Sequence, residues 1–409
     1  MKRILFMTVG TAIGEDVDKK IESLAHGLLV CIEHYKPDHI VFFGSEDSRK
    51  TIKEIERQHK SQYNKELSSY EFIQFTSIDD FDSCFQLIQN EIYKYSNSEI
   101  IIDYTSGTKT MTMSAAIAAV LFHKKLTLIS GRRKDGVVLS GTERIVEQSL
   151  YSVYDKLLLR RMKESFNNYR YNAARNYLDE IVLLNGDKTK EYYYNLIDSF
   201  SLWDRFNHKE AFDKMKQLGK EYSFNKEFLC DLLHKSDKKI EKDLYFLADL
   251  LNNAKRRLKE EKFDDAMARL YRAVELMAQY RLKSAYNLPP HDISLEQLEK
   301  LGVSSQRISY FKERKSNGSK VKLGLYDCYL VLDDLNDDLG KMFSSSNKMK
   351  DLLKERNESI LAHGLKPVKK EKVEELLDII IECIDTIFKK GKKFMKLMEL
   401  SKFPKLMVD

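Results

Sequence analysis

The chain has 409 residues, of which 43% are hydrophobic and 32% are charged, and this composition excludes an intrinsically disordered protein. Its length exceeds what one hydrophobic core usually supports, so it predicts two or three domains. The net charge of +6 is a small excess of 69 basic over 63 acidic residues, which is compatible with an RNA or nucleotide ligand without requiring one.

The five cysteines lie far apart in the sequence, and no pair has the spacing of a metal site. They indicate reduced thiols in a cytoplasmic protein, and we expect no metal and no cofactor. The apolar run Ile4–Val9 stops at Gly10, which makes it too short for a signal peptide or a membrane span. We therefore expect no membrane partner, and we interpret this run as a buried strand.

Residues 1–142 alternate two patterns that together predict an α/β Rossmann-like domain. Short apolar runs occur at Ile4–Val9, His39–Phe43, Phe72–Phe75, Glu99–Asp103 and Leu126–Ile129. Amphipathic stretches separate them at Asp16–His34, Ser48–Tyr63, Ile78–Tyr95 and Thr108–His123. Such alternation is typical of a parallel sheet with helices on both faces. A short strand at Gly136–Leu139 is expected to close the sheet in a hairpin.

From about Thr142 onward the pattern is helical, and it predicts all-α domains. We divide this part into a helical linker domain at 143–240 and a second helical domain at 241–409. Aromatic residues crowd the linker domain, among them Phe166, Phe200 and Trp203, and we interpret them as a packing core rather than a base-stacking surface. Asn185–Asp187 predicts a turn, and Pro289-Pro290 predicts a loop.

The segment Asp103–Met111 directly follows a buried strand and opens a helix. In a doubly wound sheet the carboxyl ends of the strands form the ligand crevice, and a helix N-terminus there offers free N–H groups to an anion. We expect an anion site at Thr105, Ser106, Gly107, Thr108 and Lys109. The alternative is an ordinary helix start capped by Thr105 or Ser106. The phosphate-loop spacing is incomplete, so ordinary nucleotide hydrolysis is not predicted.

A second polar loop follows the first strand at Thr8, Gly10 and Thr11. Alone it is a weak signal, because glycine often ends a strand. It is nevertheless expected at the same edge of the sheet as the first loop, and the two together favour ligand binding there.

The third group is Arg356, Asn357 and His363. The histidine lies seven positions after the arginine, which in a continuous helix stacks them on one face two turns apart. Arginine matches phosphate oxygens and histidine transfers protons near neutral pH, so the pair could cleave RNA through the ribose 2′-hydroxyl without a metal. The alternative is a solvated arginine and a histidine near a helix end, and spacing alone favours it.

Two resemblances to known families favour the catalytic interpretation of these residues over that alternative. Asp103–Met111 resembles the signature of the CRISPR-associated Rossmann-fold (CARF) sensor domains. Arg356–His363 resembles the motif of the HEPN ribonucleases, in which four to six residues separate arginine from histidine, and the polar residue after the arginine also matches. A CARF domain followed by a helical HEPN domain resembles the ancillary ribonucleases of type III CRISPR systems.

This resemblance implies activation by a cyclic oligoadenylate bound across a CARF homodimer, and a single-stranded RNA substrate cut by two HEPN motifs together. His363 is then expected to assist proton transfer, Arg356 to stabilise the scissile phosphate and Asn357 to orient the site. Products would end in a 2′,3′-cyclic phosphate and a 5′-hydroxyl. No stable DNA binding is expected.

Two alternatives remain open from the sequence. The protein could be a non-catalytic sensor whose helical part binds a partner. The sensor domain could also cleave its own cyclic nucleotide, an activity that is compatible with the ribonuclease.

Overall fold

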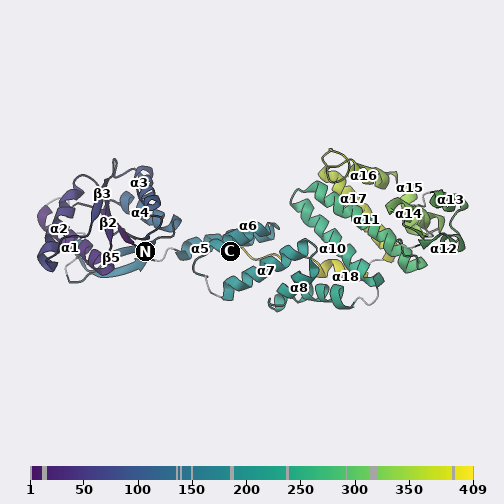
Figure 1. The fold of residues 1–409 in the computed structure, drawn as a ribbon, viewed down its shortest axis with the longest axis horizontal. Helices are drawn as coiled ribbons and strands as arrows, with labels where there is room; N and C mark the ends of the chain where they lie inside the picture. Colours follow the sequence, from purple (N-terminus) through teal and green to yellow (C-terminus); the bar gives the residue numbers. More distant parts are fainter. Residues whose placement is uncertain are drawn as a thin grey trace. The chain divides into compact units, whose positions relative to one another are not determined.

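The computed structural model describes residues 2–11, 16–134, 137–138, 141–148, 151–184, 188–235, 239–291, 293–313, 320–388 and 392–408. The chain folds as two compact units, Met1–Leu157 and Leu158–Asp409. The first unit holds the sheet and the second is almost entirely helical (Figure 1).

The first unit is built on a six-stranded sheet with the order β3-β2-β1-β4-β5-β8. Its strands are β1 (Arg3–Val9), β2 (His39–Gly44), β3 (Tyr70–Gln74), β4 (Glu99–Asp103), β5 (Lys125–Ser130) and β8 (Arg144–Gln148). The first five are parallel, and β8 pairs antiparallel with β5. Its helices are α1 (Val17–Tyr35), α2 (Ser48–Tyr63), α3 (Phe81–Lys94) and α4 (Lys109–Leu121). The predicted α/β Rossmann-like class is confirmed.

Successive residues of β1 enter different cores because side chains alternate across a strand. Ile4 and Phe6 pack in the core that α3 and α4 cover, whereas Leu5 and Met7 pack in the core that α1 and α2 cover. The sheet is therefore buried on both faces, which explains the nearly continuous apolar runs in its strands.

The strand that closes the sheet differs from the prediction. The sixth strand is β8, while β6 (Arg133–Lys134) and β7 (Val137–Val138) form a separate two-stranded hairpin. Gly136 and Leu139, the ends of the predicted strand, lie outside the described residues. Strand β8 has only two apolar residues, Ile145 and Val146, and so short an apolar pair does not distinguish a strand from the start of the helical region.

The second unit contains the remaining helices and two short strands. They are α5 (Tyr151–Asn167, which begins in the first unit), α6 (Tyr171–Glu180), α7 (Lys188–Asp204), α8 (His208–Met215), η1 (Lys220–Tyr222), α9 (Ser223–Cys230), η2 (Asp231–Lys235), α10 (Lys239–Lys259), α11 (Phe263–Tyr286), β9 (Ile293–Ser294), α12 (Leu295–Lys300), α13 (Ser305–Glu313), β10 (Lys320–Val321), α14 (Leu325–Asp334), α15 (Asp338–Ser345), α16 (Asn347–Asn357), α17 (Lys370–Phe388) and α18 (Lys392–Leu400). Within the described ranges, no helix is long and apolar enough to cross a membrane.

The aromatic residues of the linker region form a core, as predicted. Phe166, Phe200 and Trp203 are fully buried, and the Trp203 ring stacks on Phe200 and Phe228. Pro289-Pro290 lies in the loop between α11 and α12, also as predicted. The predicted turn at Asn185–Asp187 lies outside the described residues.

Candidate functional site

The two polar loops of the first unit meet at the carboxyl ends of β1 and β4, which are neighbours in the sheet. The Thr8 hydroxyl donates to the carbonyl oxygen of Ser106 at 2.5 Å, and the Gly10 N–H donates to Ser106 Oγ at 2.8 Å. A Cβ at Gly10 would lie 2.9 Å from the Gly107 nitrogen, so only glycine allows this approach. The structure thus brings the two predicted loops together.

Asp103 anchors the second of these loops. Its side chain is fully buried, and its two carboxylate oxygens accept hydrogen bonds from the Thr105 N–H at 3.0 Å and the Thr105 hydroxyl at 2.9 Å. Burial raises the pKa of Asp103 to about 6, although the bonds from Thr105 oppose this. The sequence pattern placed Asp103 in the motif but gave no sign of this anchoring role.

Thr108, rather than Thr105 or Ser106, caps α4. Its hydroxyl accepts from the Met111 N–H at 3.2 Å and donates to the carbonyl oxygen of Ile78 at 2.8 Å. Gly107 has a φ of +122°, a conformation that glycine adopts without strain. The helix start is therefore capped, as the alternative expected, but the capping residue is Thr108 and not Thr105 or Ser106.

These contacts separate the predicted ligand residues into two groups. The hydroxyls of Thr8, Thr105 and Ser106 are engaged inside the protein, so their contribution is to shape the loops. Lys109 is exposed, and it begins α4, whose first N–H groups lack intrahelical acceptors. Thr11, next to Gly10 on the first loop, is half-buried. This edge therefore offers an anion a helix N-terminus and the exposed ammonium group of Lys109.

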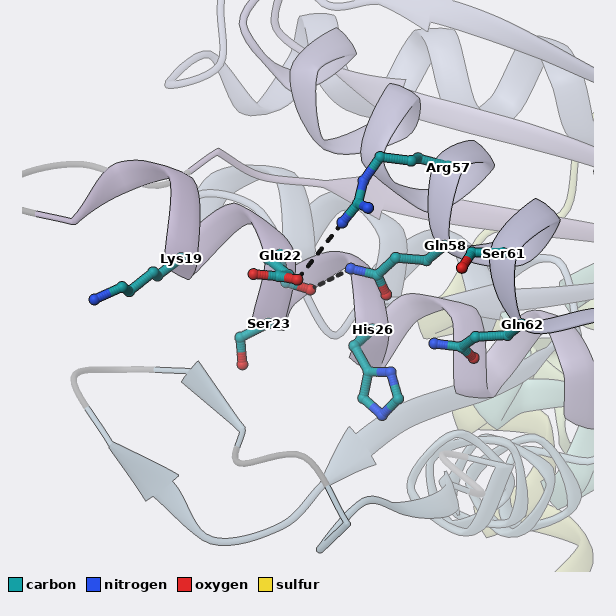
Figure 2. A pocket seen from close by; sticks show the side chains of 8 residues that line it. All are labelled: Lys19, Glu22, Ser23, His26, Arg57, Gln58, Ser61 and Gln62. Carbon is teal, nitrogen blue, oxygen red and sulfur yellow. Dashed lines mark hydrogen bonds and ion pairs between the residues drawn. The ribbon is translucent and has the colours of Figure 1, made fainter.

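A cavity of about 480 Å³ lies elsewhere on this unit, between α1 and α2 (Figure 2). Polar side chains line it, and across it Arg57 pairs with Glu22 at 3.5 Å while Gln58 Nε2 donates to the Glu22 carbonyl at 2.8 Å. None of the predicted ligand residues lines this cavity. Lys19 and Arg57 bring two positive charges to its lining and Glu22 one negative charge, and Arg57 is already paired with both Glu22 and Glu54. The loops at the sheet edge therefore remain the candidate for an anion.

The Arg356–His363 segment is not helical throughout, which corrects the prediction of two stacked turns. Helix α16 ends at Asn357, so Arg356 lies in its last turn and His363 lies in the turn that follows. The pattern could not show this, because Glu358–His363 has no residue that forbids a helix. The helix ends before the break at Gly364-Leu365-Lys366-Pro367 that the sequence does indicate.

The turn after α16 folds back on the helix end. The His363 N–H donates to the Asn357 carbonyl at 3.2 Å, and the Lys366 N–H donates to the Glu358 carbonyl at 3.1 Å. A Cβ at Gly364 would collide with the carbonyl oxygen of Glu358, so the turn requires glycine there. The fold thus returns the backbone of His363 to Asn357, and the motif is assembled by a turn instead of by helical spacing.

Arg356 is the most constrained residue of the motif. Its Nη1 donates to Asn357 Oδ1 at 3.2 Å, and its guanidinium carbon lies 4.3 Å from the centre of the Tyr271 ring on α11. His363 is exposed, whereas Arg356 and Asn357 are half-buried. The sequence did not indicate Tyr271, because it lies on another helix and carries no motif.

Comparisons with known proteins match most of the second unit to two domains. Residues 154–247 match the family model "Csm6 6H domain", and residues 235–387 match "Csm6 HEPN domain". A search of curated protein sequences gives no match. The solved structure of Enterococcus italicus Csm6 bound to cyclic hexa-2′-fluoro-hexa-dAMP is 16% identical, with 98% of each chain covered and a TM-score of 0.65. At this identity the likeness shows a shared fold along the whole chain.

A Rossmann-like sheet followed by a helical region that carries a HEPN domain defines a CARF–HEPN protein of CRISPR systems. The two matched models are both domains of Csm6 and together extend over more than half of the chain. This protein belongs to the Csm6 family.

Proposed function

We propose that this protein is a ribonuclease that a cyclic oligoadenylate activates, acting in the cytoplasm in type III CRISPR defence. The observation that carries the proposal is the place of Arg356, Asn357 and His363 around the end of α16, inside the residues that match the Csm6 HEPN domain. The ligand of the Enterococcus italicus structure supports the class of activator. We assign sensing to 1–142, linkage to 143–240 and catalysis to 241–409.

The proposed chemistry uses the nucleophile that RNA itself carries. His363 assists the proton transfers at the 2′-hydroxyl and the leaving 5′-oxygen, while Arg356 stabilises the charge that develops on the scissile phosphate. Asn357 holds the guanidinium through its amide oxygen. Cleavage then gives a 2′,3′-cyclic phosphate and a 5′-hydroxyl, and it needs no metal.

The decisive experiment measures cleavage of a fluorescent single-stranded RNA against a panel of cyclic oligoadenylates of different ring sizes. We expect one ring size to activate strongly, and linear oligoadenylates to serve as the control for the ring. Cleavage that no member of the panel changes would contradict ligand activation. A complete lack of cleavage with a ligand that binds would instead favour a non-catalytic sensor.

We propose that the activator's phosphates bind where the two polar loops meet, at Thr8, Gly10, Thr11 and Thr105–Lys109. Replacing Lys109 with alanine is expected to weaken activator affinity about 10- to 100-fold, because it removes a charge-assisted bond to phosphate. Calorimetry measures this directly. Lys125→Ala is the matched control, since Lys125 begins β5 at the opposite end of the strands. Equal activator affinities for the Lys109→Ala and Lys125→Ala variants would show that the ligand does not bind at this edge.

We propose that the active form is a homodimer, because one Arg356–His363 pair is a sparse site and a two-fold axis brings two pairs together. An exposed apolar stripe on α4, made of Met113, Ile117 and Leu121, follows the proposed ligand loop and suits a second copy of the chain. These side chains are 50%, 37% and 49% exposed.

The stripe gives a second prediction. Sedimentation is expected to give the mass of two chains, and Ile117→Asp is expected to weaken association at least tenfold, because it places a charge in an apolar contact on both copies. Phe224→Asp, which changes another exposed apolar residue on α9, is the matched control. A wild-type protein that is monomeric and fully active at assay concentration would contradict the dimer.

A further inference from the structure

The side chain of Arg356 is held from several sides although it lies at the end of a helix. The Tyr271 ring covers one face of its guanidinium at 4.3 Å, and Asn357 Oδ1 accepts from Nη1 at 3.2 Å. Its Nε is buried and has no hydrogen-bond acceptor among the described residues. None of the contacts in the described part of the chain engages Nη2.

This arrangement is unusual for an arginine whose role is structural. A buried N–H donor without an acceptor costs free energy, and native proteins leave few such groups. A structural arginine would turn its planar fork toward a carboxylate, as Arg281 and Arg307 do elsewhere in this unit. Arg256 also lies over an aromatic ring, but it pairs with the carboxylate of Asp204. Arg356 faces an aromatic ring but pairs with no carboxylate among the described residues, and its Nη2 edge, which none of them engages, can meet an outside anion.

The Tyr271 ring restricts the orientation of the Arg356 guanidinium. An arginine side chain has many rotamers, and holding it still costs conformational entropy. Stacking on an aromatic face holds the plane of the guanidinium without using any of its N–H donors. Tyr271 lies in the long helix α11, which packs on both α16 and α17, so the ring itself is well fixed.

We propose that Tyr271 is a positioning residue of the nuclease site, and that its ring holds the Arg356 guanidinium in the orientation that meets the scissile phosphate. This inference rests on the proposed ribonuclease function. The aromatic face of Tyr271 holds the guanidinium, and its hydroxyl takes no part in this. Burial raises the pKa of Tyr271, so the hydroxyl stays protonated at neutral pH.

The test compares three variants in activated RNA cleavage. Tyr271→Phe keeps the ring and is expected to cleave at nearly the wild-type rate. Tyr271→Leu keeps an apolar side chain but removes the ring, and it is expected to lower kcat about two- to thirtyfold with a smaller change in KM. Tyr310→Leu, an exposed tyrosine on α13 in the same matched domain, is the control and should have no effect.

A series of fluorinated phenylalanines at position 271 separates positioning from folding. Fluorine withdraws charge from the ring face but hardly changes its shape, so kcat should fall stepwise with each added fluorine. A flat series would overturn the inference, as would a Tyr271→Phe variant that loses as much activity as Tyr271→Leu.

A double-mutant cycle with Arg356→Lys completes the experiment. The effect of Tyr271→Leu should shrink when residue 356 is lysine, because the planar group that the ring holds is gone. Full additivity would overturn the inference. Arg356→Ala is measured in the same assay: if it cleaves normally, the proposed function fails, whereas an inactive Arg356→Ala beside an unaffected Tyr271→Leu defeats only the role of Tyr271.

Discussion

Replacing His363 with alanine is expected to reduce RNA cleavage about 10²–10⁴-fold, which is the usual contribution of a general acid or base. Replacing Arg356 with alanine is expected to reduce it about 10²–10³-fold, because one stabiliser of developing charge is lost. Activator binding should persist in both variants, since the proposed ligand residues belong to the other compact unit. Cleavage is measured under saturating activator, and binding is measured by calorimetry on the same preparations.

Two matched controls test whether position or residue type matters. His291→Ala changes an exposed histidine, and Arg307→Ala changes an arginine that pairs with Asp334 at 3.4 Å. Both lie within the residues that match the Csm6 HEPN domain. They should cleave at about the wild-type rate. A His363→Ala variant that is as active as these controls would place the chemistry elsewhere in the protein.

Cleavage by the wild type should also continue in the presence of a metal chelator. The proposed reaction takes its nucleophile from the ribose and its proton transfers from His363, so no metal-bound water is required. Loss of cleavage on chelation, with recovery on adding Mg²⁺, would contradict this mechanism. Analysis of the product ends gives an independent check, because a metal-activated water would not leave a 2′,3′-cyclic phosphate.

The strands of the sensor could be predicted because they are buried on both faces. Such a strand has a run of apolar residues that few other structures produce, as Ile4–Val9 illustrates. Strand β8 could not be predicted in this way, since it lies at the sheet edge and only some of its residues are covered. Its five residues include only one adjacent apolar pair, Ile145 and Val146, which is too short a pattern to distinguish a strand from the start of a helix.

The nuclease motif could be predicted as a set of residues but not as a geometry. The types and order of Arg356, Asn357 and His363 are visible in the sequence, whereas the end of α16 depends on the turn that Gly364 permits. Contacts between segments that are far apart in the sequence could not be predicted either. Tyr271 is 85 positions from Arg356, and no periodicity connects an aromatic residue on one helix with an arginine on another.

A buried charge network in the helical unit was likewise invisible in the sequence. Asp204 ends α7 and is 7% exposed. Its carboxylate accepts from Arg256 Nε at 2.7 Å and from Asn253 Nδ2 at 3.0 Å, and it also pairs with Arg257. Helix α7 belongs to the residues that match the Csm6 6H domain, and these partners on α10 belong to those that match the HEPN domain. The network therefore joins the two matched regions.

We expect Asp204→Ala to lower the free energy of unfolding of this unit by about 1.5–3 kcal/mol, because it removes the carboxylate that Arg256 and Arg257 share and leaves them only Asp249 and Glu260. The only tryptophan of the chain, Trp203, is buried beside Asp204, so its fluorescence during urea unfolding reports on this unit alone. Asp198→Ala is the matched control on the same helix, where the more exposed pair with Arg175 at 2.6 Å should contribute at most about 1 kcal/mol. If both variants unfold at the same urea concentration, the network does not hold α7 on α10, and the link between the matched regions must come from apolar packing around Trp203 instead.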